Sequence, residues 1–592
     1  MSDDAVAGEK VLKGIAVYPG IVIGKAHLVD RSKVKILYQY LVNTEHLNEE
    51  VERFEEALRV VENEMQSLKN GMAEKVNDLS FILDSHLMIL KDSMLRDATI
   101  HTIQDEKINA EWALKKSLEK IRKVFSQIDD EYISNRISDV ENVTERIQRT
   151  LSGKAQESLA EIDRRVIIVA HDLSPADTTE LNIEKVMGFI TDVGGRTSHT
   201  AIMAQALEIP AVVGLETATD LVVDGDLLIL DGSTGMVVVN PDDRAIIYYQ
   251  EKKLQLEDYR SSIARESHLP AITPDGQRIA ITANIEFVEE VAAVRDYGGE
   301  GIGLYRTEFL YLRCKGFPKE EDLFEDYREV AELMAPDSVN IRTLDIGGDK
   351  FVSELEFAKE MNPALGLRAI RFCLKQPEIF KTQLRAILRA SVYGKIRLLF
   401  PMISGLQELL EAKDILAQVK KDMDRDHIPY DEKIEIGIMV EIPSAVVMAE
   451  VLARHVDFFS IGTNDLIQYT LAIDRVNEHV AHMYQPFDPA ILRMIGNVVE
   501  AAKNEGIHVT LCGEMAGDPL CVPILLGLGL DGLSMNAGSI PLIKKIVRAM
   551  PMAQARDDLK EIMRLHTAQA VQQYLFERTG GMFPKLREKG YL

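Results

Sequence analysis

Eight short apolar segments, each followed by a helical stretch, restrict the fold of this 592-residue chain more than any other feature. They recur within residues 271–592, at 279–283, 301–304, 339–344, 396–400, 434–440, 458–461, 508–511 and 530–534. Parallel strands need a long crossover between them, usually a helix, so eight strand-then-helix units predict a closed (β/α)8 TIM barrel. Active sites in such barrels lie at the carboxyl ends of the strands.

Polar and charged side chains follow these apolar segments, at the positions where strands should end. They are Asn284, Arg306, Glu308, Arg342, Asp345, Glu441, Asn464, Asp465, Cys512 and Glu514. Because the strands of a parallel barrel end on one rim, we expect these side chains to converge there. The carboxylates of Glu441 and Asp465 suit Mg2+, which prefers oxygen ligands and keeps several waters. Cys512 is open to two interpretations, a buried core thiol or a proton carrier.

Four arginines indicate what the rim binds. Arg306 and Arg342 end apolar segments, whereas Arg368 and Arg475 lie in the connections that follow. A guanidinium group matches the oxygens of phosphate and carboxylate, so several arginines at one barrel mouth predict a small polyanionic substrate.

The first half of the chain changes its pattern twice. Strand patterns within residues 11–29 and again within 166–239 predict a small α/β domain. Between them, heptad spacing begins at Leu47 and continues through Leu68, and other helical stretches follow without strands, so we expect an inserted all-helical domain.

These patterns predict the domain boundaries. The predicted domains are an α/β domain of residues 1–30 and 156–242, a helical insertion of residues 31–155, a charged helical linker of residues 243–270, and the barrel of residues 271–592. Hinges are expected at the linker ends, near Asn240-Pro241 and Leu269-Pro270.

One histidine, His199, lies in an unusual sequence context. His199 follows Gly194-Gly195-Arg196-Thr197-Ser198 and precedes an apolar helical stretch. A hydroxyl residue can cap a helix that starts here, and the free N–H groups and positive dipole end of a helix N-terminus favour an anion. Arg196 and the hydroxyls could neutralise a phosphoryl group on the imidazole, so we interpret His199 as a phosphoryl-accepting nucleophile.

Composition argues against several classes of function. The formal net charge of −26 disfavours nucleic acid or an anionic membrane as a general partner, and indicates either a basic protein partner or only high solubility. Four widely separated cysteines suggest neither a disulfide framework nor a zinc site. The acidic start does not resemble a signal peptide, and no run of about 20 apolar residues could span a bilayer. We therefore expect a cytoplasmic protein.

Long motifs in both halves resemble those of known families. Residues 194–204 resemble the phosphohistidine signature of the phosphoenolpyruvate-utilising enzymes. Residues 303–310, 342–350, 362–368 and 459–466 resemble the barrel motifs of the enzyme I family, the phosphoenolpyruvate–protein phosphotransferases of the bacterial sugar phosphotransferase system. The resemblance covers nearly the whole chain in the same order.

This resemblance implies an activity and an assembly. It implies an enzyme that takes a phosphoryl group from phosphoenolpyruvate onto His199 with Mg2+, releases pyruvate, and passes the group to a histidine of the phosphocarrier protein HPr to drive sugar uptake. It also implies that the α/β domain swivels, that HPr docks on the helical insertion, and that the barrel forms a homodimer.

The resemblance also assigns roles to individual residues. Glu441 and Asp465 would hold Mg2+, and Cys512 would protonate the enol carbon. The residues assigned to the substrate are Arg306, Arg342, Arg368, Asn464, Asp465 and Arg475.

Other proteins share parts of this pattern. Phosphoenolpyruvate synthase and pyruvate phosphate dikinase share the histidine and barrel modules, but they also need a large nucleotide-binding domain. The nitrogen-regulatory paralogue of enzyme I carries an extra N-terminal sensory domain. A non-catalytic regulatory scaffold is disfavoured because His199, Arg306, Arg342, Glu441 and Cys512 are all present.

Overall fold

The computed structural model describes residues 9–29, 38–40, 44–71, 90, 93–125, 140, 143–144, 146–152, 162, 164–173, 185–195, 199–206, 209–312, 316–346, 362–475 and 480–588. The chain forms two compact units, Met1–Leu254 and Gln255–Leu592. The predicted fold class is confirmed, because the first unit contains an α/β sheet and a helical region and the second contains a closed barrel.

The first unit is built on one eight-stranded mixed sheet with the strand order β1-β8-β7-β3-β4-β5-β6-β2. Its strands are β1 (Lys10–Lys13), β2 (Ile15–Tyr18), β3 (Ile21–Val29), β4 (Val166–Ala170), β5 (Val186–Thr191), β6 (Ala211–Val213), β7 (Leu227–Asp231) and β8 (Met236–Val239). Strands β3 and β4 pair in parallel, with Lys25 opposite Val166. Segments from before and after the helical insertion therefore join in one sheet, as the strand patterns predict.

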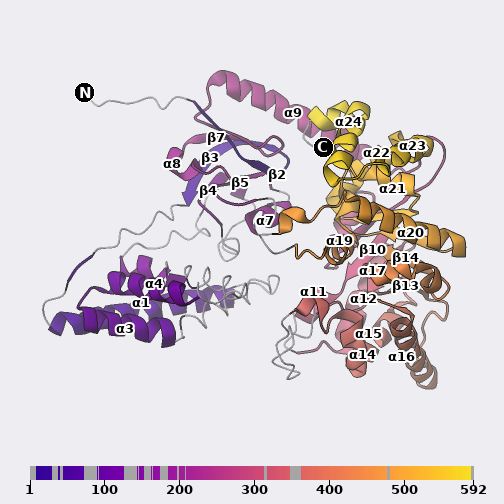
Figure 1. Ribbon diagram of the computed structural model, residues 1–592, viewed down its shortest axis with the longest axis horizontal. Coiled ribbons are helices and arrows are strands. Elements are labelled where there is room, and N and C mark those ends of the chain that lie inside the picture. The colour runs from indigo at the N-terminus through magenta and orange to yellow at the C-terminus, as the bar shows by residue number, and fades with distance from the viewer. Residues whose placement is uncertain are drawn as a thin grey trace. The chain divides into compact units, whose positions relative to one another are not determined.

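Three helices of the insertion, α1 (Thr44–Gly71), α3 (Ser93–Glu106) and α4 (Ala110–Phe125), pack against one another around a core of their own (Figure 1). The heptad positions Leu47, Phe54 and Leu58 of α1 are buried in this core, which confirms the predicted pattern. The helix predicted near residues 76–95 lies largely outside the described residues. Within the stretch predicted near 137–151, residues 146–151 are helical, and Ile147 and Leu151 are buried in the same core.

Eight parallel strands close the barrel of the second unit. Figure 1 labels three of them, β10, β13 and β14. They are β9 (Ala280–Ile285), β10 (Gly301–Arg306), β11 (Ser338–Arg342), β12 (Lys395–Phe400), β13 (Glu435–Val440), β14 (Phe458–Ile461), β15 (His508–Leu511) and β16 (Gly532–Met535). Strand β16 closes the ring against β9, with Gly532 opposite Ala280. Each apolar segment of the sequence corresponds to one strand, so the barrel prediction is confirmed.

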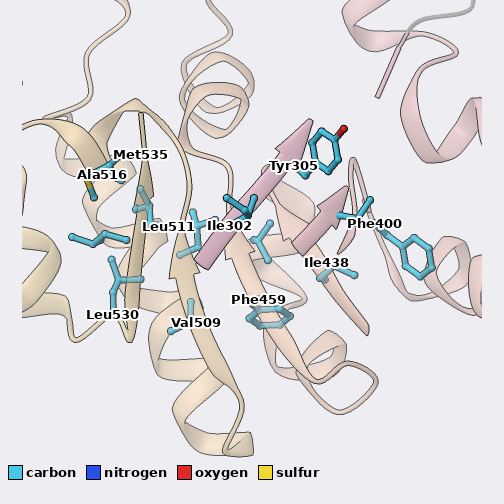
Figure 2. Packing of buried hydrophobic residues seen from close by; sticks show 14 of the residues in the cluster. Ile302, Tyr305, Phe400, Ile438, Phe459, Val509, Leu511, Ala516, Leu530 and Met535 are labelled. Carbon is cyan, nitrogen blue, oxygen red and sulfur yellow. The ribbon is translucent and has the colours of Figure 1, made fainter. Parts of the chain in front are cut away.

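Helices cover the outside of the barrel strands. They are α10 (Glu290–Asp296), α11 (Glu308–Leu312), α12 (Glu320–Met334), α14 (Ala369–Lys375), α15 (Pro377–Ala390), α16 (Leu406–Arg425), α17 (Pro443–Val447), α18 (Ala449–Ala453), α19 (Thr463–Leu471), α20 (Pro489–Glu505), α21 (Val522–Leu528), α22 (Ile540–Ala549), α23 (Met552–Ile562), α24 (Ala568–Met582) and α25 (Pro584–Glu588). Ile302, Ile438 and Val509 of three strands belong to the large apolar cluster between strands and helices (Figure 2). Among the described residues, no helix is long and apolar enough to cross a membrane.

The interior of the barrel has a small cluster of its own, because successive side chains of a strand point to opposite faces. Its members are Leu304, Leu399, Met439, Phe458 and Cys512.

Helix α9 (Asp243–Glu266) begins on the sheet of the first unit. Ile246 and Tyr249 pack against the apolar cluster of β3, β7 and β8, and Lys252 forms an ion pair of 2.6 Å with Asp231. The first half of the helix is therefore fixed to the sheet.

The second half of α9 is fixed to the barrel unit. Tyr259 packs against the large apolar cluster of the barrel unit, and the ammonium of Lys545 lies 4.4 Å from the centre of its ring. The buried ammonium of Lys544 donates to the carbonyl of Ser267 at 2.9 Å, directly after the helix. The boundary between the units lies between Leu254 and Gln255. This boundary falls inside the helix, and the hinges near Asn240-Pro241 and Leu269-Pro270 stay predictions.

Candidate active site at the mouth of the barrel

The predicted site residues of the second unit lie at the carboxyl ends of the barrel strands. Arg306 and Arg342 are the last residues of β10 and β11. Glu441 and Cys512 directly follow β13 and β15, and Asp465 lies in the first turn of α19, after β14. Because the strands are parallel, these residues share one end of the barrel.

Arg342 belongs to a buried network of ion pairs. Its guanidinium donates to Glu308 Oε1 at 2.7 Å and lies 3.1 Å from Asp345 Oδ2. Burial lowers the pKa of Arg342, but the carboxylates of Glu308 and Asp345 raise it by more. The guanidinium therefore keeps its charge in the interior of the site.

Arg368, at the start of α14, extends this network to Asp465. Its guanidinium donates to Asp345 Oδ1 at 2.9 Å and to Asp465 Oδ2 at 3.2 Å. Burial raises the pKa of Asp345, yet the charges of Arg342 and Arg368 lower it below its ordinary value. One ionised carboxylate thus holds two arginines in place.

Arg306 has a separate carboxylate partner, Glu286, whose Oε1 accepts a hydrogen bond from the guanidinium at 2.8 Å. Arg306, Arg342 and Arg368 are therefore all paired, and an incoming anion would share or replace these carboxylates.

Glu441 and Asp465 form the candidate metal site. Glu441 is 2% exposed, and its Oε1 accepts the backbone N–H of Met402 at 2.7 Å. A Cβ at Gly462 would come within 2.8 Å of Glu441 Oε2, so the chain passes this carboxylate closely. Burial raises the pKa of Glu441 well above its ordinary value, and the charge of Asp465 acts in the same direction. A cation bound by these carboxylates would offset both effects.

The donor set fits Mg2+ better than a transition metal. The described residues contain no group of three or more His, Cys, Asp or Glu side chains that could hold a metal ion. Mg2+ is ordinarily bound by one or two protein carboxylates, with water and substrate oxygens completing its shell.

Asn464 and Arg475 lie beside this network. Asn464 Nδ2 donates to Glu514 Oε1 at 3.0 Å, and its Oδ1 accepts the N–H of Glu514 at 2.9 Å. Arg475 is exposed after the end of α19, and its side chain contacts the phenol of Tyr484. Tyr484 Oη in turn donates to the carbonyl of Asn464 at 3.3 Å. The structure thus links Arg475 to the rim through Tyr484, without an ion pair to the buried carboxylates described above.

Cys512 is 3% exposed at the end of β15. Its Sγ lies 3.2 Å from Ser460 Oγ, which donates to it, and 3.6 Å from the carbonyl oxygen of Ile461. Burial raises the pKa of the Cys512 thiol, and Ser460 and Arg342 offset this only in part. The sulfur therefore keeps its proton at neutral pH, which agrees with a core thiol and with an acid.

His199 belongs to the other unit and is the first residue of α7 (His199–Ala206), so the predicted helix start is confirmed. Its side chain, together with Arg196, Thr197 and Ser198, lies outside the described residues. The segment before them is held by the buried carboxylate of Asp192, which accepts the N–H of Thr219 at 3.1 Å.

Comparison with known proteins decides the family of the chain. The phosphoenolpyruvate-protein phosphotransferase of Bacillus sp. (strain S) is 44% identical over 564 residues, which cover 95% of this chain and 97% of that protein. The protein of the same name from Bacillus subtilis (strain 168) is 43% identical over 567 residues, which cover 96% and 99%. The chain belongs to the phosphoenolpyruvate–protein phosphotransferase family.

Three family descriptions match successive parts of this phosphotransferase. They are the N-terminal domain (residues 13–136), the mobile domain (162–235) and the PEP-binding domain (260–552) of PEP-utilising enzymes. A solution structure of an Enzyme I protein is 40% identical and covers 42% of this chain and 99% of its own, with a TM-score of 0.37. The near full-length identity to the two phosphotransferases and the three family matches confirm the resemblance drawn from the motifs, and the chain is an enzyme of this family.

Several residues that contact the candidate site escaped prediction from the sequence. Ser460, whose hydroxyl contacts Cys512, lies within an apolar strand and gives no signal of its own. Glu286 follows the first barrel strand by one residue, and this position at a strand end is the signal that could have found it. Tyr469, which accepts a hydrogen bond from Arg368 at 3.2 Å, lies on the helix that carries Asp465.

Proposed function

We propose that this chain transfers the phosphoryl group of phosphoenolpyruvate to His199, releases pyruvate, and passes the group to a histidine of HPr, the cytoplasmic step that drives sugar uptake. The observation that supports this most is the network of Arg342, Arg368, Asp345 and Asp465 at the mouth of the barrel. Phosphoryl transfer depends on positioning and charge neutralisation more than on covalent chemistry from the protein, and this network supplies both.

The substrate would bind through the arginines of the rim. Arg306, Arg342 and Arg475, with Asn464, would bind the phosphate oxygens, because guanidinium groups bind phosphate in a bidentate manner. Arg368 would act with them, since it already bridges Asp345 and Asp465.

Glu441 and Asp465 would hold Mg2+. The bound ion would neutralise charge on the transferring phosphoryl group and orient the substrate oxygens. Asp465 has a second task, because its Oδ2 accepts a hydrogen bond from Arg368 and so ties the metal ligands to the anion-binding residues.

The reaction then divides between two side chains. The imidazole of His199 would attack phosphorus in line, so that an N–P bond forms while the bond between phosphorus and the enol oxygen breaks. The Cys512 thiol would give its proton to C3 of the resulting enolate, which yields pyruvate, and the thiolate would then take a proton from water.

The remaining parts of the chain would serve the second transfer. The helical insertion, residues 31–155, would dock HPr, and the exposed carboxylates of Glu49, Glu52 and Glu56 on α1 favour a basic partner. The barrel would form the homodimer, and its surface exposes the large apolar side chains of Val447 and Met483.

Labelling with phosphoenolpyruvate that carries radioactive phosphate tests this proposal. His199→Ala should form no stable phosphoprotein, because the accepting nitrogen is gone. His171→Ala is the matched control and should leave labelling intact. His171 directly follows β4 in the same domain, and its Nδ1 lies 3.3 Å from Asp192 Oδ2. Full labelling of His199→Ala would rule out His199 as the acceptor.

A further inference from the structure

The inward face of β14 places a hydroxyl group against the Cys512 thiol. Ser460 is fully buried, and its Oγ donates to Cys512 Sγ at 3.2 Å. The backbone N–H of Cys512 donates to the carbonyl oxygen of Ile461 at 3.0 Å, and the thiol approaches the same oxygen at 3.6 Å. The sulfur is thus held between a donor and an acceptor that are neighbours on one strand.

The backbone of Cys512 is held from the two strands that follow β15 around the ring, β16 and β9. Asn284 Nδ2 donates to the Cys512 carbonyl at 2.9 Å, and Ser534 Oγ donates to Asn284 Oδ1 at 2.6 Å. The next residue, Gly513, leaves no room for a side chain, because a Cβ there would come within 1.8 Å of Thr463 Oγ1. These contacts fix the backbone that carries the thiol.

We infer that Ser460 is a positioning residue for Cys512. The Ser460 hydroxyl orients the thiol and stabilises the thiolate that remains after proton transfer. This inference rests on the proposed function, in which Cys512 is the proton donor. Because the Ser460 hydroxyl donates to the sulfur, the S–H bond must point elsewhere, toward the Ile461 carbonyl or a substrate carbon.

The chemistry gives the hydroxyl a larger effect during the reaction than before it. As the S–H bond breaks and the C–H bond at C3 of the enolate forms, the sulfur becomes an anion in a buried site. A hydrogen bond to an anion is roughly twice as strong as one between neutral groups, so the Ser460 contact strengthens as charge develops. The Ser460 hydrogen bond also lowers the pKa of the thiol against the opposing effect of burial.

The test is Ser460→Ala in the full-length protein. We expect the kcat of pyruvate formation to fall about tenfold, because one hydrogen bond to a developing charge is lost. The KM for phosphoenolpyruvate should change less than about twofold, because a transition-state interaction is lost while the arginine cluster is intact. Ser460→Thr should restore most of the rate, since it keeps the hydroxyl.

Thr510→Val is the matched control. Thr510 lies two residues before Cys512 on the same inward face of β15, and its hydroxyl donates to the Phe459 carbonyl at 3.4 Å and not to the sulfur. This variant should keep the wild-type kcat. An equal loss in Thr510→Val and Ser460→Ala, or no recovery in Ser460→Thr, would reduce Ser460 to a packing residue.

A second measurement separates this inference from the role of Cys512 itself. The rate at which iodoacetamide alkylates Cys512, followed by mass spectrometry against pH, reports the thiolate without any turnover. Ser460→Ala should move this profile to higher pH and Thr510→Val should not, so an unchanged profile in Ser460→Ala would overturn the inference. If Cys512→Ala makes pyruvate at the wild-type rate, the proposed acid fails while the alkylation result still decides whether Ser460 controls the thiol.

Discussion

At the scale of single residues, Glu441 is the carboxylate of the candidate site whose negative charge neighbouring cations and hydrogen bonds offset least. Its pKa is raised by burial and by Asp465, so the ionised form destabilises the folded protein at neutral pH unless a cation binds. Glu441→Gln should therefore leave the melting temperature without Mg2+ unchanged or higher. It should also raise the Mg2+ concentration needed for half-maximal pyruvate formation by roughly 100-fold or more, because an anionic ligand is lost.

Glu435→Gln provides the control for this change. Glu435 opens the same strand, β13, at the opposite end of the barrel and pairs with Arg397 at 2.7 Å. It should leave the Mg2+ dependence as in the wild type. If Glu441→Gln also kept that dependence, Glu441 would only close the barrel end and would not bind the ion.

The sequence predicts single residues where position and chemistry coincide. Arg306, Arg342 and Glu441 were predictable because each is a charged residue at the end of an apolar segment, and only a strand end on the rim accommodates that pattern. Ser460 was not predictable, because a serine inside a strand of a barrel has many ordinary uses. Its role depends on the inward face of β14, which only the closed ring defines.

At the scale of elements, the helical insertion lies in the crossover between two parallel strands. β3 and β4 pair in register from Lys25 opposite Val166 to Val29 opposite Ala170, and a parallel crossover needs about a dozen residues or more. Replacing residues 31–155 with a flexible linker of about 20 residues should therefore preserve the sheet.

Replacing residues 31–155 should affect the two phosphoryl transfers differently, the first from phosphoenolpyruvate to the chain and the second from the chain to HPr. Phosphorylation from phosphoenolpyruvate should continue, whereas transfer to HPr should be lost, because the proposed docking surface is gone. In the intact chain, Glu49→Gln with Glu52→Gln should slow the association with HPr and weaken its dependence on salt. Normal transfer to HPr after the replacement would place the docking surface elsewhere.

Most element boundaries were predictable because a single pattern governed them. Every barrel strand and the α1 heptads follow from apolar periodicity, whose physical origin is one-sided burial. The linker was harder. The charged composition of residues 243–270 predicts a helix between domains. Tyr259 packs against the core of one unit and Ile246 against the sheet of the other, and periodicity does not distinguish these partners.

At the scale of the whole molecule, the proposed reaction requires motion. His199 belongs to the unit Met1–Leu254 and Cys512 to the unit Gln255–Leu592, whereas in-line transfer needs reacting atoms within about 3–3.5 Å. The imidazole must also reach HPr on another surface. We therefore expect at least two arrangements of the units in solution.

Distances between spin labels measure these arrangements. Val223 and Lys421 are exposed, one in each unit, and cysteines introduced there can carry labels without touching the site. Diluting labelled chains with unlabelled ones isolates the distance within one chain. Phosphoenolpyruvate with Mg2+ should shift the population between two distances, and a single distance under all conditions would rule out the swivelling domain.

Helix α9 has a mechanical consequence of its own. The ion pair of Lys252 fixes the helix to one unit, and the hydrogen bond of Lys544 to Ser267 fixes its end to the other. The residues between these contacts, from Lys253 to Glu266, include neither glycine nor proline. A bend there would open only a few backbone hydrogen bonds, each with a net value of about 1 kcal/mol. The helix would then bend elastically: thermal energy would be enough to bend it, and it would straighten again as its own hydrogen bonds re-form.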